Sequence, residues 1–270
     1  AVLQSEDPAI ARIMEDPQRY ELQIRYTRIL REGDSVRFQD YDFRVDPQLY
    51  FYPASTVKFP IAVAALEKLR ASNRFDRKMA YYYEGDSVVR SFEKDILEIF
   101  AVSDNHASNR LFEFLGQDAI NESLRSKGVR PVRIAHRLGF RRDDTSTVPL
   151  IISLNDSLST QTLPITNSAP RPLEIEGVRK GQGYMDGDSL IREPFDFSLK
   201  NYLPLGSLHG ILKRVIFPEA FPPEQRFALG EAQRDFLLEA MKVTPRELGY
   251  DPEQYPDGYC KFFIYGDGTE

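Results

Sequence analysis

The amino-acid sequence predicts an α+β fold, and three observations support this prediction. A helix and a β-hairpin come first, a long helical middle follows, and the last residues begin a further strand. Strands and helices that are grouped in this way, rather than alternating, are typical of α+β domains. We therefore expect a helical domain beside an antiparallel sheet. Only the N-terminal hairpin of that sheet is clearly present in this chain of 270 residues.

Residues 1–54 are predicted to supply a helix and a hairpin to the α/β part. Asp7 is a favoured N-cap residue, and the proline after it suits the first helical position. Apolar and polar residues then alternate from 20 to 30, which indicates a half-buried strand with Tyr26 on its inner, apolar face. A turn leads into a second strand over 35–45, so the two strands form a hairpin.

Residues 55–245 are expected to form a helical domain. The stretch 55–72 is apolar on nearly every side, which predicts a helix buried at the centre of the domain. The other helices are predicted where apolar residues recur at helical spacing between capping residues: 91–105, 106–116, 118–128, 206–215 and 231–243.

A different composition interrupts these helices between about 141 and 200. Ser, Thr, Pro, Gly and Asp dominate there, which indicates an insertion of loops with a short hairpin. We expect residues 179–183, which include Arg179, Lys180 and Gly181, to form the turn of that hairpin. Residues 246–270 are predicted to start the return to the sheet, with a strand that stops early.

Composition and charge exclude several classes of function. Basic and acidic residues are interspersed, with a net charge of −6, so nucleic acid is not expected as a partner. Cys260 is the only cysteine, which excludes an internal disulfide bond and a cysteine-based metal site. No apolar run reaches the roughly 18–20 residues of a membrane span, and no signal-peptide pattern is found. No metal or cofactor motif is found, so none is expected.

The most informative stretch places Ser55 and Lys58 at the start of the apolar helix. Residues at i and i+3 share one face of a helix, so the lysine amine should lie beside the serine hydroxyl. A partly desolvated lysine can act as a base toward a serine nucleophile. Ser91 and Lys94 have the same spacing, but their polar setting indicates a helix cap and an exposed lysine.

A second polar group, Ser103, Asp104 and Asn105, follows where an apolar helix is expected to end. Ser103 can pass a proton between Lys58 and a leaving amine. Asn105 can donate to a substrate carbonyl and hold Lys58 in place. The simpler interpretation is that Asp104 or Asn105 only caps the next helix, because both residue types are favoured caps.

Together these motifs resemble those of the class A β-lactamases and penicillin-binding proteins, whose signature joins Ser-x-x-Lys, Ser-Asp-Asn and Lys-Thr-Gly. The resemblance covers residues 1–140 and, more loosely, 200–245. It implies a β-lactamase/transpeptidase-like fold. It also implies a serine hydrolase that needs no metal or cofactor and forms an acyl-enzyme from β-lactams or D-Ala-D-Ala-like amides. A bacterial, periplasmic protein is expected from the resemblance alone.

The same resemblance assigns a role to each residue of the expected site. Ser55 attacks the amide carbonyl, Lys58 takes the serine proton, and Ser103 relays that proton to the leaving nitrogen. Asn105 orients and binds the substrate.

The sequence departs from this family in two places. No Lys-Thr-Gly or Lys-Ser-Gly string occurs, so we expect a truncated or cleaved form of a longer chain, with a separate C-terminal fragment as one way to complete the sheet. The stretch 132–144 lacks the glutamate that activates the deacylating water in the β-lactamases, and Glu174 and Glu176 are weak substitutes. The alternative function is therefore a penicillin-binding or sensor-type module that acylates slowly, or not at all, and does not turn over.

Overall fold

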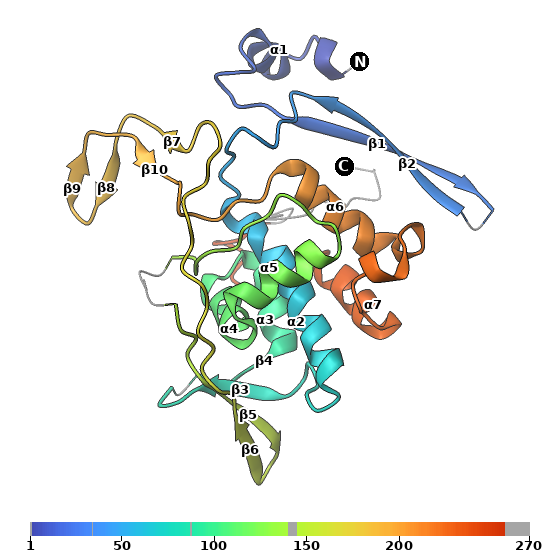
Figure 1. Ribbon diagram of the computed structural model, residues 1–270, viewed down its shortest axis with the longest axis vertical. Coiled ribbons are helices and arrows are strands. Elements are labelled where there is room, and N and C mark those ends of the chain that lie inside the picture. Colours follow the sequence, from blue (N-terminus) through green and yellow to red (C-terminus); the bar gives the residue numbers. More distant parts are fainter. Residues whose placement is uncertain (1, 34, 87, 140–144, 257–270) are drawn as a thin grey trace.

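The computed structural model describes residues 2–33, 35–86, 88–139 and 145–256. Helices occupy the centre of the molecule, with a long hairpin at one end and a small sheet at the other (Figure 1). Within the described residues, no helix is long and apolar enough to cross a membrane. The strand expected near the C-terminus, together with Cys260, lies outside the described residues.

The N-terminal elements match the expected order. Helix α1 (Pro8–Glu15) is capped by Asp7, whose carboxylate accepts the backbone N–H of Ala9 at 2.8 Å. Strands β1 (Ile24–Glu32) and β2 (Ser35–Phe43) then pair antiparallel along their full lengths. Strand β1 therefore begins later than the alternating pattern predicted.

The expected inner face of the hairpin is wrong. Tyr26 pairs with Tyr41 across the strands, and their side chains are 61% and 46% exposed. The opposite face packs on helix α6 (Leu205–Ile216), where the ammonium of Lys213 lies 2.6 Å from the carboxylate of Asp40. This face also carries the buried Val36 and the half-buried Phe38, whose ring lies 5.6 Å from that of Phe217, so it packs through apolar as well as charged contacts. No described element covers the tyrosines.

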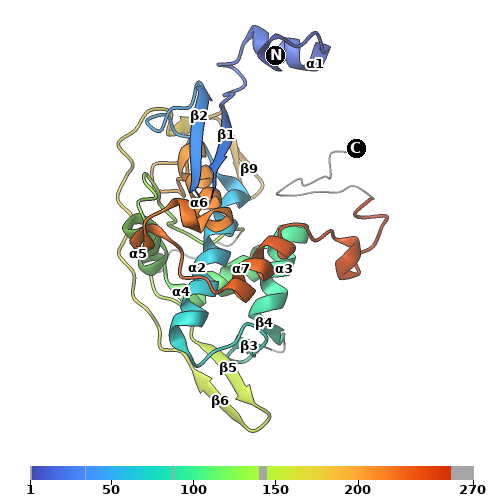
Figure 2. The ribbon, with the colours of Figure 1, turned by 90° about the vertical axis from the view of Figure 1, so that its right-hand side faces the viewer.

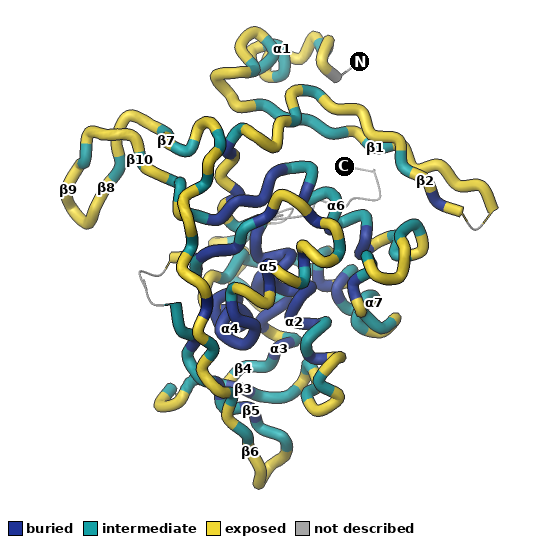
Figure 3. Tube along the Cα trace, viewed as in Figure 1, coloured by how far each residue is buried: buried dark blue, intermediate teal, exposed yellow. Residues whose placement is uncertain are grey.

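Helix α2 (Lys58–Ser72) forms the centre of the helical domain, as its apolar sequence predicts. A 3₁₀ turn (Ala54–Val57) leads into it, and its residues from Lys58 to Leu66 are buried. The surrounding helices are α3 (Phe92–Val102), α4 (Asn105–Leu115), α5 (Gln117–Ser126) and α7 (Glu231–Ala240). The deepest burial in the chain coincides with α2 and α4 (Figure 3).

A four-stranded antiparallel sheet below these helices was not predicted. Its order is β4 (Arg90–Ser91), β3 (Ala80–Tyr83), β5 (Leu150–Asn155) and β6 (Leu158–Gln161). The strands are short, and β3 pairs with a strand far along the chain, so local alternation gives little signal. The sheet lies at the end of the molecule opposite the N-terminal hairpin, as Figure 2 shows.

The insertion folds as two nested hairpins rather than one. Strands β7 (Arg179–Lys180) and β10 (Phe195–Asp196) pair outside β8 (Tyr184–Asp186) and β9 (Ser189–Ile191). The turn expected over 179–183 is wrong for Arg179 and Lys180, which lie in β7; residues 181 and 182 do form a bend, but it joins β7 to β8, which do not pair. The turn of the inner hairpin lies at Gly187, whose positive φ of 60° suits glycine. Short 3₁₀ turns complete the fold: Val2–Gln4, Pro218–Ala220, Pro223–Gln225 and Arg246–Leu248.

Candidate active site

Lys58 is fully buried, and its amine is surrounded by oxygen atoms. The Nζ donates to the backbone carbonyl of Ser103, lies 3.0 Å from the Ser103 Oγ, and lies 2.7 Å from the Asn105 Oδ1. A lysine ammonium carries three donors, and oxygens of these kinds can accept from it. The structure therefore brings together three of the four residues that the sequence nominated.

The corner between α3 and α4 places Ser103 and Asn105 on Lys58. Ser103 closes α3 in the left-handed conformation, with φ 59°, and its N–H donates to the Ile99 carbonyl at 3.1 Å. Asp104 follows in extended backbone, and its carboxylate accepts the Ala107 N–H at 2.6 Å. Asp104 thus caps α4, while the residues on either side of it contact the lysine. Capping and lysine binding, which were alternatives for this motif, are divided among neighbouring residues.

Ser55 lies half-buried in the 3₁₀ turn before α2. Its backbone carbonyl accepts the N–H of Lys58, so the two residues occupy the same first turn. No described side chain caps this turn. Two amides of this turn already have acceptors, because the Thr56 N–H donates to the Pro53 carbonyl at 3.0 Å and the Lys58 N–H donates to the Ser55 carbonyl.

The second Ser-x-x-Lys pair has only a structural role, as its sequence context predicted. The Ser91 Oγ accepts the Lys94 N–H at 3.1 Å and caps α3. The Lys94 side chain is 56% exposed, and its Nζ lies 4.0 Å from Glu98. The same spacing therefore gives a buried lysine in one place and a solvated lysine in the other.

Sequence reasoning missed two residues that support the site, Asn109 on α4 and Gly139 in the loop after α5. The side-chain amide of Asn109 donates to the Leu138 carbonyl and accepts the Leu138 N–H, each at 2.9 Å. Gly139 follows with φ 65°, and a Cβ added there would lie 2.7 Å from the Asn105 Nδ2. The available signal was the glycine, because only glycine tolerates both this φ and this close approach.

Two further asparagines fix the segment 134–139 in front of α4 and α5. Asn121 accepts the Ile134 N–H at 2.8 Å and donates to the Ile134 carbonyl at 2.7 Å. The Asn201 Oδ1 accepts the Ala135 N–H at 2.7 Å. This segment belongs to the stretch in which the resemblance placed the deacylating glutamate, and it contains none.

The weak substitutes for that glutamate lie on the surface. Glu174 and Glu176 are both exposed, and among the described contacts neither carboxylate reaches Lys58 or Ser103. The Glu176 backbone instead pairs with the chain that leads toward Ser55, accepting the Tyr50 N–H at 2.7 Å. Within the described residues, no group of His, Cys, Asp or Glu side chains is arranged to hold a metal ion.

An aromatic groove begins at Tyr52, shortly before Ser55. The Tyr52 ring lies 5.0 Å from the ring of Phe197, which lies 4.7 Å from that of Phe195. The groove encloses about 540 Å³, and His136 forms part of its wall. The His136 Nδ1 lies 2.6 Å from the Arg137 carbonyl, and burial lowers the pKa of this histidine. The ring is therefore expected to be neutral near pH 7.

Comparison with known proteins points to one family. The family model described as the beta-lactamase enzyme family matches residues 9–162. No curated protein matches the chain. Among solved structures, a β-lactamase from Burkholderia vietnamiensis is 14% identical, with a TM-score of 0.49, and the match covers 94% of this chain and 76% of that one.

Two other solved structures are also similar to the chain. The TLA-3 extended-spectrum β-lactamase is 16% identical, with a TM-score of 0.47 and coverage of 79% of this chain. A class A β-lactamase from Bacteroides cellulosilyticus is 19% identical, with a TM-score of 0.32 and coverage of 36% of this chain. The matches span 65% and 40%, respectively, of the lengths of these two proteins.

Proposed function

The chain belongs to the β-lactamase enzyme family, and from this premise we propose that it is a serine hydrolase acylated at Ser55. The observation that carries the proposal is the environment of Lys58. A fully buried lysine is rare unless its amine has partners. Here those partners are the hydroxyl of Ser103 and the amide of Asn105, in addition to a backbone carbonyl.

The proposed acylation moves one proton through these groups. The proposed step requires that the ammonium of Lys58 first lose a proton to solvent. Its neutral amine then takes the proton from the Ser55 hydroxyl as the serine oxygen forms a bond to the substrate carbonyl carbon. Ser103 then gives its hydroxyl proton to the leaving nitrogen as the C–N bond breaks, and it recovers a proton from Lys58. The 3.0 Å distance between the Lys58 Nζ and the Ser103 Oγ is suitable for this transfer.

The proposed substrates are β-lactams or amides that resemble D-Ala-D-Ala. Asn105 would orient the substrate amide, and the aromatic groove from Tyr52 to Phe195 would receive an apolar part of the acyl group. Aromatic rings bury large areas and interact favourably with apolar groups, so this groove suits a hydrophobic substituent.

A specific observation favours the alternative of a module that is acylated but does not turn over. In the segment 134–139, Gly139 lies close to the side chain of Asn105, and no residue of the segment has a carboxylate that could activate water. Without such a base, hydrolysis of the acyl-enzyme would be slow even if acylation were fast.

One experiment separates these functions. The protein is incubated with a chromogenic β-lactam while colour change and intact mass are followed together. Repeated turnover supports the hydrolase, and a stable adduct on Ser55 supports the penicillin-binding module. No adduct and no turnover with any β-lactam or D-Ala-D-Ala peptide would refute acylation at Ser55 and leave only a sensor-type module that is not acylated. Ser55→Ala serves as the matched control, because it removes one oxygen and leaves Lys58 and Ser103 in place.

We also propose that further strands of a C-terminal segment complete the sheet beside β1 and β2. One face of this hairpin packs on α6, but the other exposes Tyr26 and Tyr41, and no described element covers it. Hydrogen exchange of the β1 amides should slow when a longer form of the chain, or a separate C-terminal fragment, is supplied. Unchanged exchange and unchanged exposure of the tyrosines would contradict the proposal.

A further inference from the structure

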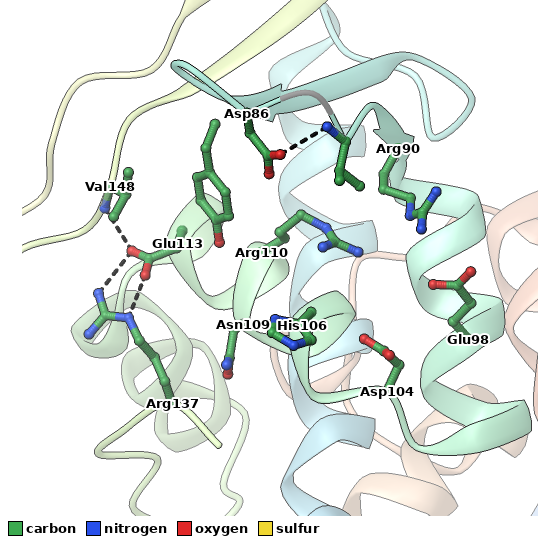
Figure 4. Close-up of a pocket in the computed structure, with 12 residues that line it drawn as sticks. Asp86, Arg90, Glu98, Asp104, His106, Asn109, Arg110, Glu113, Arg137 and Val148 are labelled. Atoms are coloured by element: carbon green, nitrogen blue, oxygen red, sulfur yellow. Dashed lines mark hydrogen bonds and ion pairs between the residues drawn. The ribbon is translucent and has the colours of Figure 1, made fainter. Parts of the chain in front are cut away.

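A second cavity lies apart from the four candidate catalytic residues. It encloses about 530 Å³ between the β3–β4 connection, α3 and α4, and none of Ser55, Lys58, Ser103 and Asn105 lines it. The cavity is within the usual size range of small-ligand pockets. Basic and acidic side chains from different elements point into the same space (Figure 4).

The basic wall carries donors that the described residues do not use. The Arg90 Nε is buried and has no hydrogen-bond partner. Arg110, which is 6% exposed, binds Asp95 through its Nε at 2.9 Å and one Nη2 at 2.6 Å. No described hydrogen bond uses the Arg110 Nη1. The Arg90 Nε is thus the buried donor that lacks a partner; such a donor is costly, and a carboxylate is the group that a guanidinium binds best.

On the acidic wall of the cavity, a buried carboxylate lacks a close basic partner. Glu98 is 8% exposed, its ion pair among the described residues is a long one with the Lys94 Nζ at 4.0 Å, and the charge of Arg90 also favours its ionised form. No ion pair joins Glu98 to Arg90 among the described residues, although both line the cavity. Burial raises the pKa of Glu98, so this carboxylate lacks full compensation. A positively charged group in the cavity would supply it.

Other charged groups of the cavity already form ion pairs or cap a helix. Arg137 and Glu113 form an ion pair and close one side, as Figure 4 shows. Asp104 caps α4. The space between Arg90 and Glu98 is therefore where the charge of a ligand would be recognised. Tyr83, Val88 and Val148 supply an adjoining apolar surface.

We propose that this cavity binds a zwitterionic amino acid or short peptide. Its carboxylate contacts Arg90 and Arg110, its ammonium contacts Glu98, and its side chain lies against Tyr83, Val88 and Val148. Asp104 and His106 also line the cavity, and they flank Asn105, which contacts Lys58. An occupant of the cavity therefore touches the same corner of the chain that holds the lysine.

The first test uses the wild-type protein and needs no catalytic activity. Isothermal titration calorimetry compares leucine and alanyl-leucine with N-acetyl-leucine, which lacks the ammonium, and leucinamide, which lacks the carboxylate. We expect saturable binding of at least one zwitterion and at least tenfold weaker binding of both blocked analogues. Tighter binding of leucine would indicate a free amino acid as the ligand, and tighter binding of alanyl-leucine would indicate a short peptide. No saturable binding of either zwitterion, or equal binding of the blocked forms, would overturn the proposal.

Variants then locate the ligand. Arg90→Gln and Glu98→Gln should each weaken binding at least tenfold, while Lys78→Gln and Glu122→Gln, which remove exposed charges elsewhere, should leave it unchanged. Ser55→Ala should also keep full binding, so a failure of the proposed hydrolase does not affect this result. Equal losses in the control variants, or loss in Ser55→Ala alone, would place the ligand elsewhere. The analogue comparison remains decisive if either cavity variant fails to fold.

Discussion

Gly139→Ala is expected to damage both the stability of the protein and the candidate active site. The residue has φ 65°, and an added Cβ would lie 2.7 Å from the Asn105 Nδ2. Left-handed backbone costs a residue other than glycine roughly 1–2 kcal/mol. Alanine also reduces the conformational freedom of the unfolded chain, which stabilises the folded state by about 0.4–1 kcal/mol and offsets part of this cost. The net backbone cost is therefore about 1 kcal/mol.

The steric contact adds a second cost. Asn105 must move away from the new methyl group, and its Oδ1 is the atom that lies 2.7 Å from the Lys58 Nζ. A hydrogen bond to a charged group contributes about 1.5–3 kcal/mol. The total loss for Gly139→Ala is then about 3 kcal/mol. At about 2–4 °C per kcal/mol for a chain of this size, the Tm should fall by about 6–12 °C.

Gly187→Ala is the matched control for this substitution. Gly187 has nearly the same φ, 60°, but a Cβ added there would meet no atom within 4 Å. It should cost only the backbone term, about 1 kcal/mol, and leave acylation of Ser55 unchanged. Gly139→Ala should slow acylation at least tenfold by mass spectrometry. In an Asn105→Ala background its extra cost should disappear. Equal losses from the two glycine substitutions would refute the proposed contact between Gly139 and Asn105.

Three other predictions follow from the described contacts. Ser55→Ala should abolish the covalent adduct with a β-lactam, whereas Ser91→Ala should keep it, as measured by mass spectrometry. Ser91→Ala should instead lower the unfolding free energy by about 1 kcal/mol in urea denaturation, because it removes the cap of α3. Burial lowers the pKa of His136, so the unfolded chain binds a proton more readily than the folded chain, and the free energy of unfolding should fall as the pH drops below about 6.5. His136→Gln should flatten this pH dependence, and an unchanged slope of unfolding free energy against pH would contradict the prediction. Phe197→Ala should raise KM more for β-lactams with a bulky aromatic acyl group than for those with a small one, and an equal effect on both would argue against the groove as a substrate site.

Local sequence patterns predicted the elements that depend on near neighbours. The all-round apolar character of 55–72 predicted the buried helix α2, and the hairpin of β1 and β2 followed from alternation. The pattern failed for the face of that hairpin, because Tyr26 is exposed and the opposite side packs, through Phe38 on Phe217 and through Asp40 on Lys213. An apolar residue on a strand is buried only where another element packs against its face of the sheet.

Contacts between distant segments limited the rest of the prediction. Strand β3 is short and pairs with β5, far along the chain, so neither has a strong local signal. The meeting of Lys58 with Ser103 and Asn105 could be expected from the family resemblance but not from spacing alone. The support from Asn109 could not be predicted, because an asparagine in a helix gives no sign of which loop it will bind.

The backbone around Lys58 shows why this site is difficult to derive from propensities. Ala54, Ser103 and Gly139 all have positive φ, at 45°, 59° and 65°, and each belongs to a different segment beside the lysine. Glycine adopts this conformation without strain, but alanine and serine each lose roughly 1–2 kcal/mol. A glycine at position 103 would relieve the strain and lose the hydroxyl that lies 3.0 Å from the Lys58 Nζ. The Ser103 carbonyl also accepts from that amine, so the strained turn and the lysine contact are one feature. Relaxing the turn would move both oxygens away from Lys58, which is the pattern expected where local strain is retained for function.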